Sequence, residues 1–303
     1  MNALANAWRT IRNDMGHWVY LIIPICLFVV FFIIPIIWTF WLSLHSWDGI
    51  SRQMKWVGSA NFTTLLFQPR FQHAVVNNLA WLVFYLLAPS GLGLLLAVIL
   101  DRGLKFEGLF RIFFFLPFTV PAVAVAAIWR WMYEPSNGLV TSVLRTAGLG
   151  GWAQNWLGNP DIVTFSLMGS VLWWTTGFAF LVFFAGLRNI PSECIEAARI
   201  EGATPWQIFW KVTFPLLWPS TIIVLGLAAI DAMRVFDIIW GTTMGGPAYS
   251  SEVMATQMYE IAFGRLEMGR ASAISVYLLV IAGLIIMPYI TYMSRRVADS
   301  EDE

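Results

Sequence analysis

Six apolar runs, each long enough to cross a lipid bilayer, restrict what this chain of 303 residues can fold into. A spanning helix needs about 20 residues, each adding about 1.5 Å of rise. The runs are Trp18 to Leu44, Val75 to Leu100, Leu109 to Tyr133, Ile162 to Leu187, Thr213 to Phe236 and Ser272 to Met293. Hydrophobic residues make up 58% of the chain and charged residues only 12%, far from the average of soluble proteins. The sequence therefore predicts an all-α, polytopic membrane bundle of about six transmembrane helices.

The first run is too long for a cleavable signal peptide. Apolar residues continue through Ile34, Pro35 and Ile36, where a cleavage site would need small residues. We therefore expect this run to remain as an anchor. We interpret residues 1–303 as a single transmembrane domain, with a core at 75–293 and a charged segment at 188–213.

The distribution of Lys and Arg predicts the orientation. Short segments on one side carry Arg9, Arg12, Arg102, Lys105, Arg111, Arg188, Arg199, Lys211, Arg295 and Arg296. Longer loops on the other side, residues 45–74, 134–161 and 237–271, carry Arg52, Lys55, Arg70, Arg130, Arg145, Arg265 and Arg270. Because short cytoplasmic loops concentrate positive charge, both chain ends and the charged segment are expected in the cytoplasm. The three longer loops are either simple connections or surfaces for a partner.

The charged segment must lie outside the hydrocarbon. Its four ionised side chains between Glu193 and Glu201 would together penalise insertion by about 10 kcal/mol. Pro191 suits the first position of a helix, and Gly202 suits the left-handed residue that ends it. Thr204, Pro205 and Gln207 then form the pattern of a capping box. The segment is therefore predicted to be two short helices joined by a turn.

Two interpretations of this segment are open from residue chemistry. Ala197 and Ala198 allow another protein to approach closely, and Glu193 and Glu196 share one helical face that can meet basic groups. Alternatively, alanine and glutamate simply favour a solvated helical loop.

A resemblance favours the docking interpretation. Glu196-Ala197-Ala198, followed by Gly202 and then by Val212-Thr213-Phe214-Pro215, resembles the EAA loop of ABC importer permeases, with Phe214 where that family prefers leucine. The resemblance implies that this loop is a coupling helix that sits in a groove of a cytoplasmic ATPase. The residues to which it assigns ATPase coupling are Glu193, Glu196, Ala197, Ala198, Arg199, Glu201 and Gly202.

Other segments resemble the carbohydrate-uptake branch of these permeases, of the maltose or glycerol phosphate type. They are residues 56–62, 111–117 and 236–237, and the tripeptide Gly245-Gly246-Pro247. The resemblance implies a multi-pass permease of the bacterial inner membrane, a second homologous permease, two ATP-binding subunits and an extracytoplasmic solute-binding protein. It also implies a sugar-like solute, no cofactor in this chain, and ATP with magnesium on the partner ATPases.

Polar groups at membrane depth mark a candidate solute path. Trp174, Thr175 and Phe178 combine aromatic faces with a hydroxyl, a combination that suits a sugar ring. Asp231 and Arg234 have helical spacing for an ion pair, which is either part of the path or a structural pair, and Asp237 follows three residues later.

The sequence argues against other classes of function. No lysine follows glycine, which excludes a phosphate-binding loop, and the three histidines are well separated, so neither an ATPase nor a membrane hydrolase is expected. A formal net charge of zero gives no argument for nucleic acid. The alternative is an ion-coupled secondary transporter that uses Asp231 or Asp237, although no paired halves are evident.

Overall fold

The structure, a computed structural model, describes residues 20–101, 103 and 105–301. Arg9, Arg12, Trp18 and Arg102, which the sequence analysis used, lie outside the described residues. Contacts divide the chain into two compact units, one formed by Met1–Leu65 with Ile261–Val276 and the other by Leu66–Glu260 with Tyr277–Glu303. The interpretation as a single domain stays a prediction, and each unit is described by itself.

The expected number of membrane-spanning segments is confirmed by length and composition. Four helices can cross a bilayer: Tyr20–Ser43, Pro69–Leu100, Val163–Arg188 and Met268–Thr291. Two further spans are bent pairs, Glu107–Thr119 with Ala122–Met132 and Pro205–Leu216 with Trp218–Met233. The described chain therefore has up to six spans when each bent pair is counted as one.

The third and fifth runs form bent spans and not continuous helices. The third run bends by 99° before Ala122, because Pro121 has an extended ψ of 140° that no helix accommodates. The fifth bends by 69° at Leu217, between Pro215 and Pro219. A proline ring lacks an N–H and clashes with the preceding turn, so closely spaced prolines break a helix at membrane depth.

The first unit contains a spanning helix followed by a cap of short elements. The spanning helix includes the π-helical turn η1 (Val29–Ile33) and α2 (Ile34–Ser43). It is followed by an antiparallel strand pair, β1 (His45–Ser46) with β2 (Lys55–Trp56), and by α3 (Ala60–Leu66). The π-helical turn η5 (Glu260–Gly264) and the start of α15 (Met268–Glu301) complete the unit.

Asn61 and Gly269 hold this cap together. The Asn61 amide donates to the carbonyls of Ser43 and His45 at 2.8 and 2.9 Å. A Cβ on Gly269 would lie 1.8 Å from the His45 carbonyl oxygen, so only glycine permits this approach. These contacts fix the backbone around His45.

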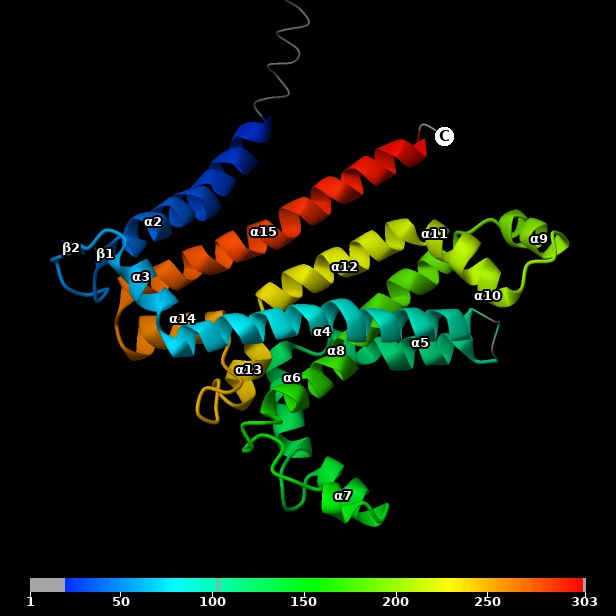
Figure 1. Cartoon of the computed structure of the whole chain (residues 1–303), viewed down its shortest axis with the longest axis horizontal. Coiled ribbons are helices and arrows are strands. Elements are labelled where there is room, and N and C mark those ends of the chain that lie inside the picture. The colour runs from blue at the N-terminus through cyan, green and yellow to red at the C-terminus, as the bar shows by residue number, and fades with distance from the viewer. Residues whose placement is uncertain (1–19, 102, 104, 302–303) are drawn as a thin grey trace, which may run out of the picture. The chain divides into compact units, whose positions relative to one another are not determined.

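The second unit is built around α4 (Pro69–Leu100) and α8 (Val163–Arg188), which lie side by side (Figure 1). They approach closely at Gly93, where a Cβ would lie 2.6 Å from the Ala179 Cβ. Buried side chains of both helices, including Trp81, Phe180 and Leu167, form the core. The remaining elements of the unit up to the charged segment are α5 (Glu107–Phe115), the 3-10 helix η2 (Leu116–Thr119), α6 (Ala122–Met132), α7 (Leu139–Thr146) and the 3-10 helix η3 (Gly150–Trp152).

The chain after α8 leaves the bundle and returns to it. It forms α9 (Ser192–Ile200), α10 (Pro205–Ile208), the π-helical turn η4 (Phe209–Thr213), α11 (Phe214–Leu216), α12 (Trp218–Met233), α13 (Asp237–Thr242) and α14 (Met254–Tyr259). Figure 1 shows α9 and α10 at the end of the unit where α4 ends and α5 begins. The charged segment therefore lies at one pole of the unit.

Candidate functional site

The charged segment forms the predicted pair of short helices. Helix α9 begins at Ser192. Pro191 is therefore its N-cap and not, as predicted, its first helical residue. Gly202 ends the turn with a left-handed φ of +80°. Thr204 and Gln207 form the predicted capping box, in which the Thr204 N–H donates to Gln207 Oε1 at 2.8 Å. The local sequence therefore specifies the hairpin without help from distant residues.

The α9 helix projects into solvent. Ala198 is half-buried, whereas Ala197, Gly202 and the four charged side chains Glu193, Glu196, Arg199 and Glu201 are exposed. None of these four charged side chains forms an ion pair with another described residue. Ile200 at 87% and Trp206 at 71% are also exposed. These exposed side chains leave the surface of α9 and the following turn accessible to a partner.

The two ends of this projecting segment are anchored in the bundle. Before α9, Ile190 packs against a core cluster that includes Phe183 and Leu217. After α10, Ile208 is 8% exposed and Leu217 is 1% exposed. The segment between Ile190 and Ile208 is therefore an arch whose two ends pack against the bundle.

A small cavity lies in the middle of the second unit. It has a volume of about 20 Å³ and polar lining from Tyr85, Ser90, Thr175 and Asp231, with Phe178 and Phe118 among its apolar walls. This space suits about one water molecule, far less than a sugar ring needs. The cavity is therefore closed to a solute in this conformation.

Tyr85 and Ser90 belong to the cavity although the sequence analysis missed them. Pro89 has no N–H to donate to the Tyr85 carbonyl four residues before it, and Ser90 Oγ donates to that carbonyl instead at 3.1 Å. A hydroxyl that compensates for a proline is a usual device in membrane helices. The sequence signal was the Pro-Ser pair inside an apolar run, one turn after a tyrosine.

The predicted path residues separate into two groups. Thr175, Phe178 and Asp231 line the cavity together. Trp174 is not among its lining residues; its indole N–H donates to the Val120 carbonyl at 3.1 Å, and its ring packs against the core. Trp174 therefore holds the bend before α6.

The expected ion pair between Asp231 and Arg234 is absent among the ion pairs of the described residues. Arg234 is the C-cap of α12 and its N–H still donates to the Ile230 carbonyl at 3.1 Å, so the helical spacing is present without the ion pair. Asp237 is exposed and begins the separate helix α13. Neither Arg234 nor Asp237 lines the central cavity.

The opposite pole of the second unit carries a buried ion pair. Arg70 binds both carboxylate oxygens of Glu252, with distances of 2.7 and 2.5 Å, and reaches Glu260 at 3.1 Å. Its guanidinium lies 3.7 Å from the centre of the Tyr249 ring. Asn77 donates to the Ser250 and Glu252 carbonyls at 2.9 and 2.7 Å. These contacts fasten the loop that contains Gly245-Gly246-Pro247 to the start of α4.

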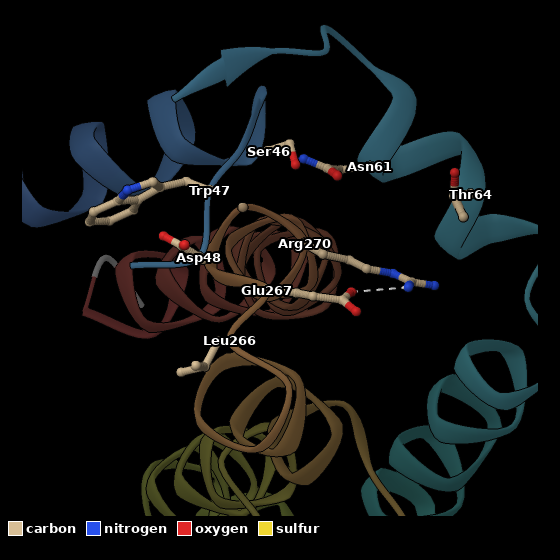
Figure 2. Close-up of a pocket in the computed structure, with 9 residues that line it drawn as sticks. Ser46, Trp47, Asp48, Asn61, Thr64, Leu266, Glu267 and Arg270 are labelled. Atoms are coloured by element: carbon tan, nitrogen blue, oxygen red, sulfur yellow. Dashed lines mark hydrogen bonds and ion pairs between the residues drawn. The ribbon is translucent and has the colours of Figure 1, made fainter. Parts of the chain in front are cut away.

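A polar hollow of about 310 Å³ lies within the first unit (Figure 2). In Figure 2, Arg270 on α15 and Glu267 just before this helix, joined at 3.2 Å, face Asn61 and Thr64 of α3. The N–H groups of Ile50 and Ser51 bind the carboxylate of Asp48, which also lines the hollow, and this lowers the pKa of that carboxyl. The hollow therefore joins polar groups of two predicted outer loops, 45–74 and 237–271.

The sequence matches a known family over most of its length. Residues 90–299 match the family described as the binding-protein-dependent transport system inner membrane component. The trehalose/maltose transport system permease protein of Thermococcus litoralis is 35% identical, over 94% of this chain and 96% of that protein. The alpha-glucoside transport system permease protein of Rhizobium meliloti is 31% identical, over 92% of this chain and 82% of that protein.

The fold has a solved counterpart. A bacterial ABC transporter involved in the import of the acidic polysaccharide alginate contains a chain that superposes with a TM-score of 0.82 at 23% identity. The match covers 96% of this chain and 99% of that chain. This likeness confirms the fold of an ABC importer permease.

The fold and the membrane spans define a transport permease of the inner membrane. The chain belongs to the family of binding-protein-dependent transport system inner membrane components. It is a permease subunit of an ABC importer and not an enzyme. The alternative of an ion-coupled secondary transporter has no support from these relatives.

Proposed function

We propose that this permease, paired with a second homologous permease, lines a path for a sugar or sugar-like solute. The observation that carries the proposal is the exposed helix α9, which lies on the residues of the EAA pattern between two ends that pack against the bundle, Ile190 and Ile208. A partner can bind the exposed surface of such a helix, and movement of the helix then displaces the transmembrane helices to which its ends connect. The names of the similar permeases, for trehalose/maltose and for alpha-glucosides, support the solute class.

In this proposal α9 seats in a groove of a cytoplasmic ATPase. Glu193, Glu196 and Glu201 offer carboxylates to basic groups, and Ala197 and Ala198 allow close approach. Two ATPase subunits bind ATP with magnesium, and their closure moves the coupling helices of both permeases. The permeases then alternate between access from outside and from inside.

The proposed solute path passes through the central cavity. Thr175 and Asp231 provide hydrogen-bonding groups, and Phe178 provides an aromatic face. Because the cavity holds only about one water, the walls must separate before a sugar ring enters. Displacement of α12 against α4 and α8 would enlarge it, since these three helices supply most of its lining.

The proposed orientation places both chain ends and α9 in the cytoplasm. Within the second unit the ends of α4 and α8 meet at the pole of α9, as this orientation requires. The Gly245-Gly246-Pro247 loop then faces outward. We assign that loop to the surface that receives the external solute-binding protein, since Arg70 and Asn77 hold it in place at the start of α4.

Coupling is tested at Gly202. A Cβ there would meet open space, so a substitution acts through backbone conformation and through any partner that lies against the turn. Asparagine and aspartate both tolerate the left-handed region, and only aspartate adds charge. Complexes with the partner subunits would be reconstituted in proteoliposomes for ATP hydrolysis and sugar uptake.

Gly202→Asp should hydrolyse ATP without sugar uptake, whereas the matched Gly202→Asn variant should keep most uptake. Normal uptake by a correctly assembled Gly202→Asp complex would refute the coupling assignment. The solute class is tested separately with labelled maltose, trehalose and N-acetylglucosamine against labelled phosphate and glutamine. Uptake of phosphate or glutamine alone would refute the sugar class.

A further inference from the structure

Four charged side chains meet where α8 ends: one from the residue that directly follows α4, two from α5 and one from α8. Arg188 Nε lies 3.0 Å from Asp101 Oδ1, and Arg188 Nη2 donates to Glu107 Oε2 at 2.8 Å. Arg111 pairs with the other oxygen of Glu107. We call Asp101, Glu107, Arg111 and Arg188 the clasp. The clasp contains two positive and two negative side chains. Arg188 binds Asp101 and Glu107 from other segments, and Arg111 binds Glu107 one turn earlier in its own helix.

An aromatic ring sets the geometry of the clasp. The guanidinium carbons of Arg111 and Arg188 lie 4.1 and 5.1 Å from the centre of the Phe184 ring, and Phe184 is 4% exposed. Glu107 has only 18% of its side chain exposed. A planar guanidinium can lie on a ring and donate in two directions at once, which a lysine cannot do. The clasp therefore requires arginine at position 188 rather than a positive charge alone.

The helices that the clasp joins also form walls of the central cavity. Asp101 directly follows α4, which carries Ser90; Glu107 and Arg111 lie in α5, which leads to Phe118 in η2. Arg188 is the last residue of α8, which carries Phe178 and Thr175. The remaining wall of the cavity comes from α12, and no residue of α12 belongs to the clasp.

The arch of α9 and α10 connects these two parts. It leaves the clasp at Arg188, three residues before Pro191, and it reaches α12 across the break at Leu217. We propose that the clasp makes α4, α5 and α8 move as one body, so that displacement of α9 moves α12 against them and opens the cavity. Arg188 is then a positioning residue for coupling. The inference rests on the proposed function in one respect, namely that an ATPase moves α9.

The first test neutralises the clasp. Arg188→Gln complexes, reconstituted with the partner subunits, should assemble and hydrolyse ATP within about twofold of wild type, while sugar uptake per ATP falls about tenfold. Arg188→Lys should be impaired also, because one ammonium cannot hold both carboxylates in the same geometry. Arg130→Gln, which removes an exposed arginine from the end of α6, is the matched control and should behave as wild type. The labelled sugar is the one that wild type takes up fastest among maltose, trehalose and N-acetylglucosamine.

The second test restores the connection with a covalent bond. Asp101→Cys with Arg188→Cys, in a Cys26→Ser, Cys194→Ser background, should be uncoupled as it stands. A short bis-maleimide reagent that joins the two cysteines should recover uptake to at least half that of the cysteine-free background. A purely structural role would not predict recovery of uptake at unchanged ATP hydrolysis. If joining the cysteines leaves uptake abolished, the clasp must open during transport and the one-body proposal is wrong.

The two proposals fail in different ways. If α9 is not the coupling element, Gly202→Asp will transport normally. If only the clasp inference is wrong, Gly202→Asp will be uncoupled while Arg188→Gln transports sugar at the wild-type ratio to ATP. If gel filtration shows that the Arg188→Gln complex does not assemble, the clasp inference is judged by the cross-linking test alone.

Discussion

Removal of Arg70 should destabilise the protein more than removal of either of its carboxylate partners. Arg70 and Glu252 have 12% and 3% of their side chains exposed, and the guanidinium binds both carboxylate oxygens. Breaking a buried pair by removing one partner typically costs about 3 to 5 kcal/mol, because the other charge is left without compensation. Arg70→Met takes both guanidinium hydrogen bonds from the buried Glu252 carboxylate, so we expect a loss of about 3 kcal/mol.

Glu252→Gln should cost less. Arg70 keeps Glu260 at 3.1 Å and keeps the Tyr249 ring, so only one charged hydrogen-bonding partner is weakened, a loss of about 1.5 kcal/mol. The double variant Arg70→Met/Glu252→Met replaces the pair by apolar side chains and should return to within about 1 kcal/mol of wild type. Glu260, with 30% of its side chain exposed, then retains access to water.

The assay is thermal unfolding of the purified protein in one detergent. A loss of about 3 kcal/mol corresponds to a fall of about 6 to 10 °C in the midpoint. Arg130→Met, at an exposed position, should shift it by no more than about 2 °C. The reasoning is refuted if Glu252→Gln is as damaging as Arg70→Met, or if the double variant is less stable than both single variants.

Three further predictions concern single positions. Gly177→Ala should lower stability by about 1 to 3 kcal/mol in the same assay, because its Cβ would lie 2.1 Å from the Phe114 carbonyl oxygen; unchanged unfolding would show that α5 and α8 can separate at no cost. Ser90→Ala should cost about 1 kcal/mol by leaving the Tyr85 carbonyl without its donor, and Ser90→Thr should not, so equal losses would argue against that hydrogen bond. Glu134 accepts hydrogen bonds from two backbone N–H groups, and these lower its pKa. Its contribution to the stability of this turn is therefore complete above the ordinary carboxyl pKa of 4.5 and is lost as pH falls through the lowered pKa. The difference in hydrogen-exchange protection of those amides between wild type and Glu134→Gln should disappear over that range, and a difference that persists in more acidic solution would contradict the sign.

The features that were predictable from sequence are those in which neighbouring residues determine the geometry. Gly202 ends α9 because it alone in that stretch adopts a left-handed conformation freely, and Thr204 caps α10 through Gln207 three residues later. The number of spans was predictable for a related reason, since hydrocarbon thickness sets the length of each apolar run. These features need no knowledge of distant contacts.

The features that escaped sequence analysis depend on where helices end and which helices meet. The spacing of Asp231 and Arg234 suggested an ion pair, but spacing alone does not fix the direction of an exposed arginine side chain at the end of α12. Arg188 meets Asp101 and Glu107 across separations of more than 80 residues, which no local pattern reveals. Periodicity gives the partners of a residue only inside one helix, so tertiary ion pairs must come from the structure.

The broken fifth span depends both on neighbouring residues and on distant contacts. Pro215 and Pro219 are visible in the sequence, and they bracket the break at Leu217, where two helical segments meet at 69°. Leu217 is 1% exposed and packs in the same cluster as Phe184, which lies beneath the clasp. A continuous helix from Pro205 to Met233 would hold α12 at one fixed angle to the arch, whereas a break at the buried Leu217 gives α12 a hinge about which its angle can change when the arch moves. The prolines therefore place the hinge between the arch and α12 beside Phe184, the residue of α8 on which the clasp arginines lie.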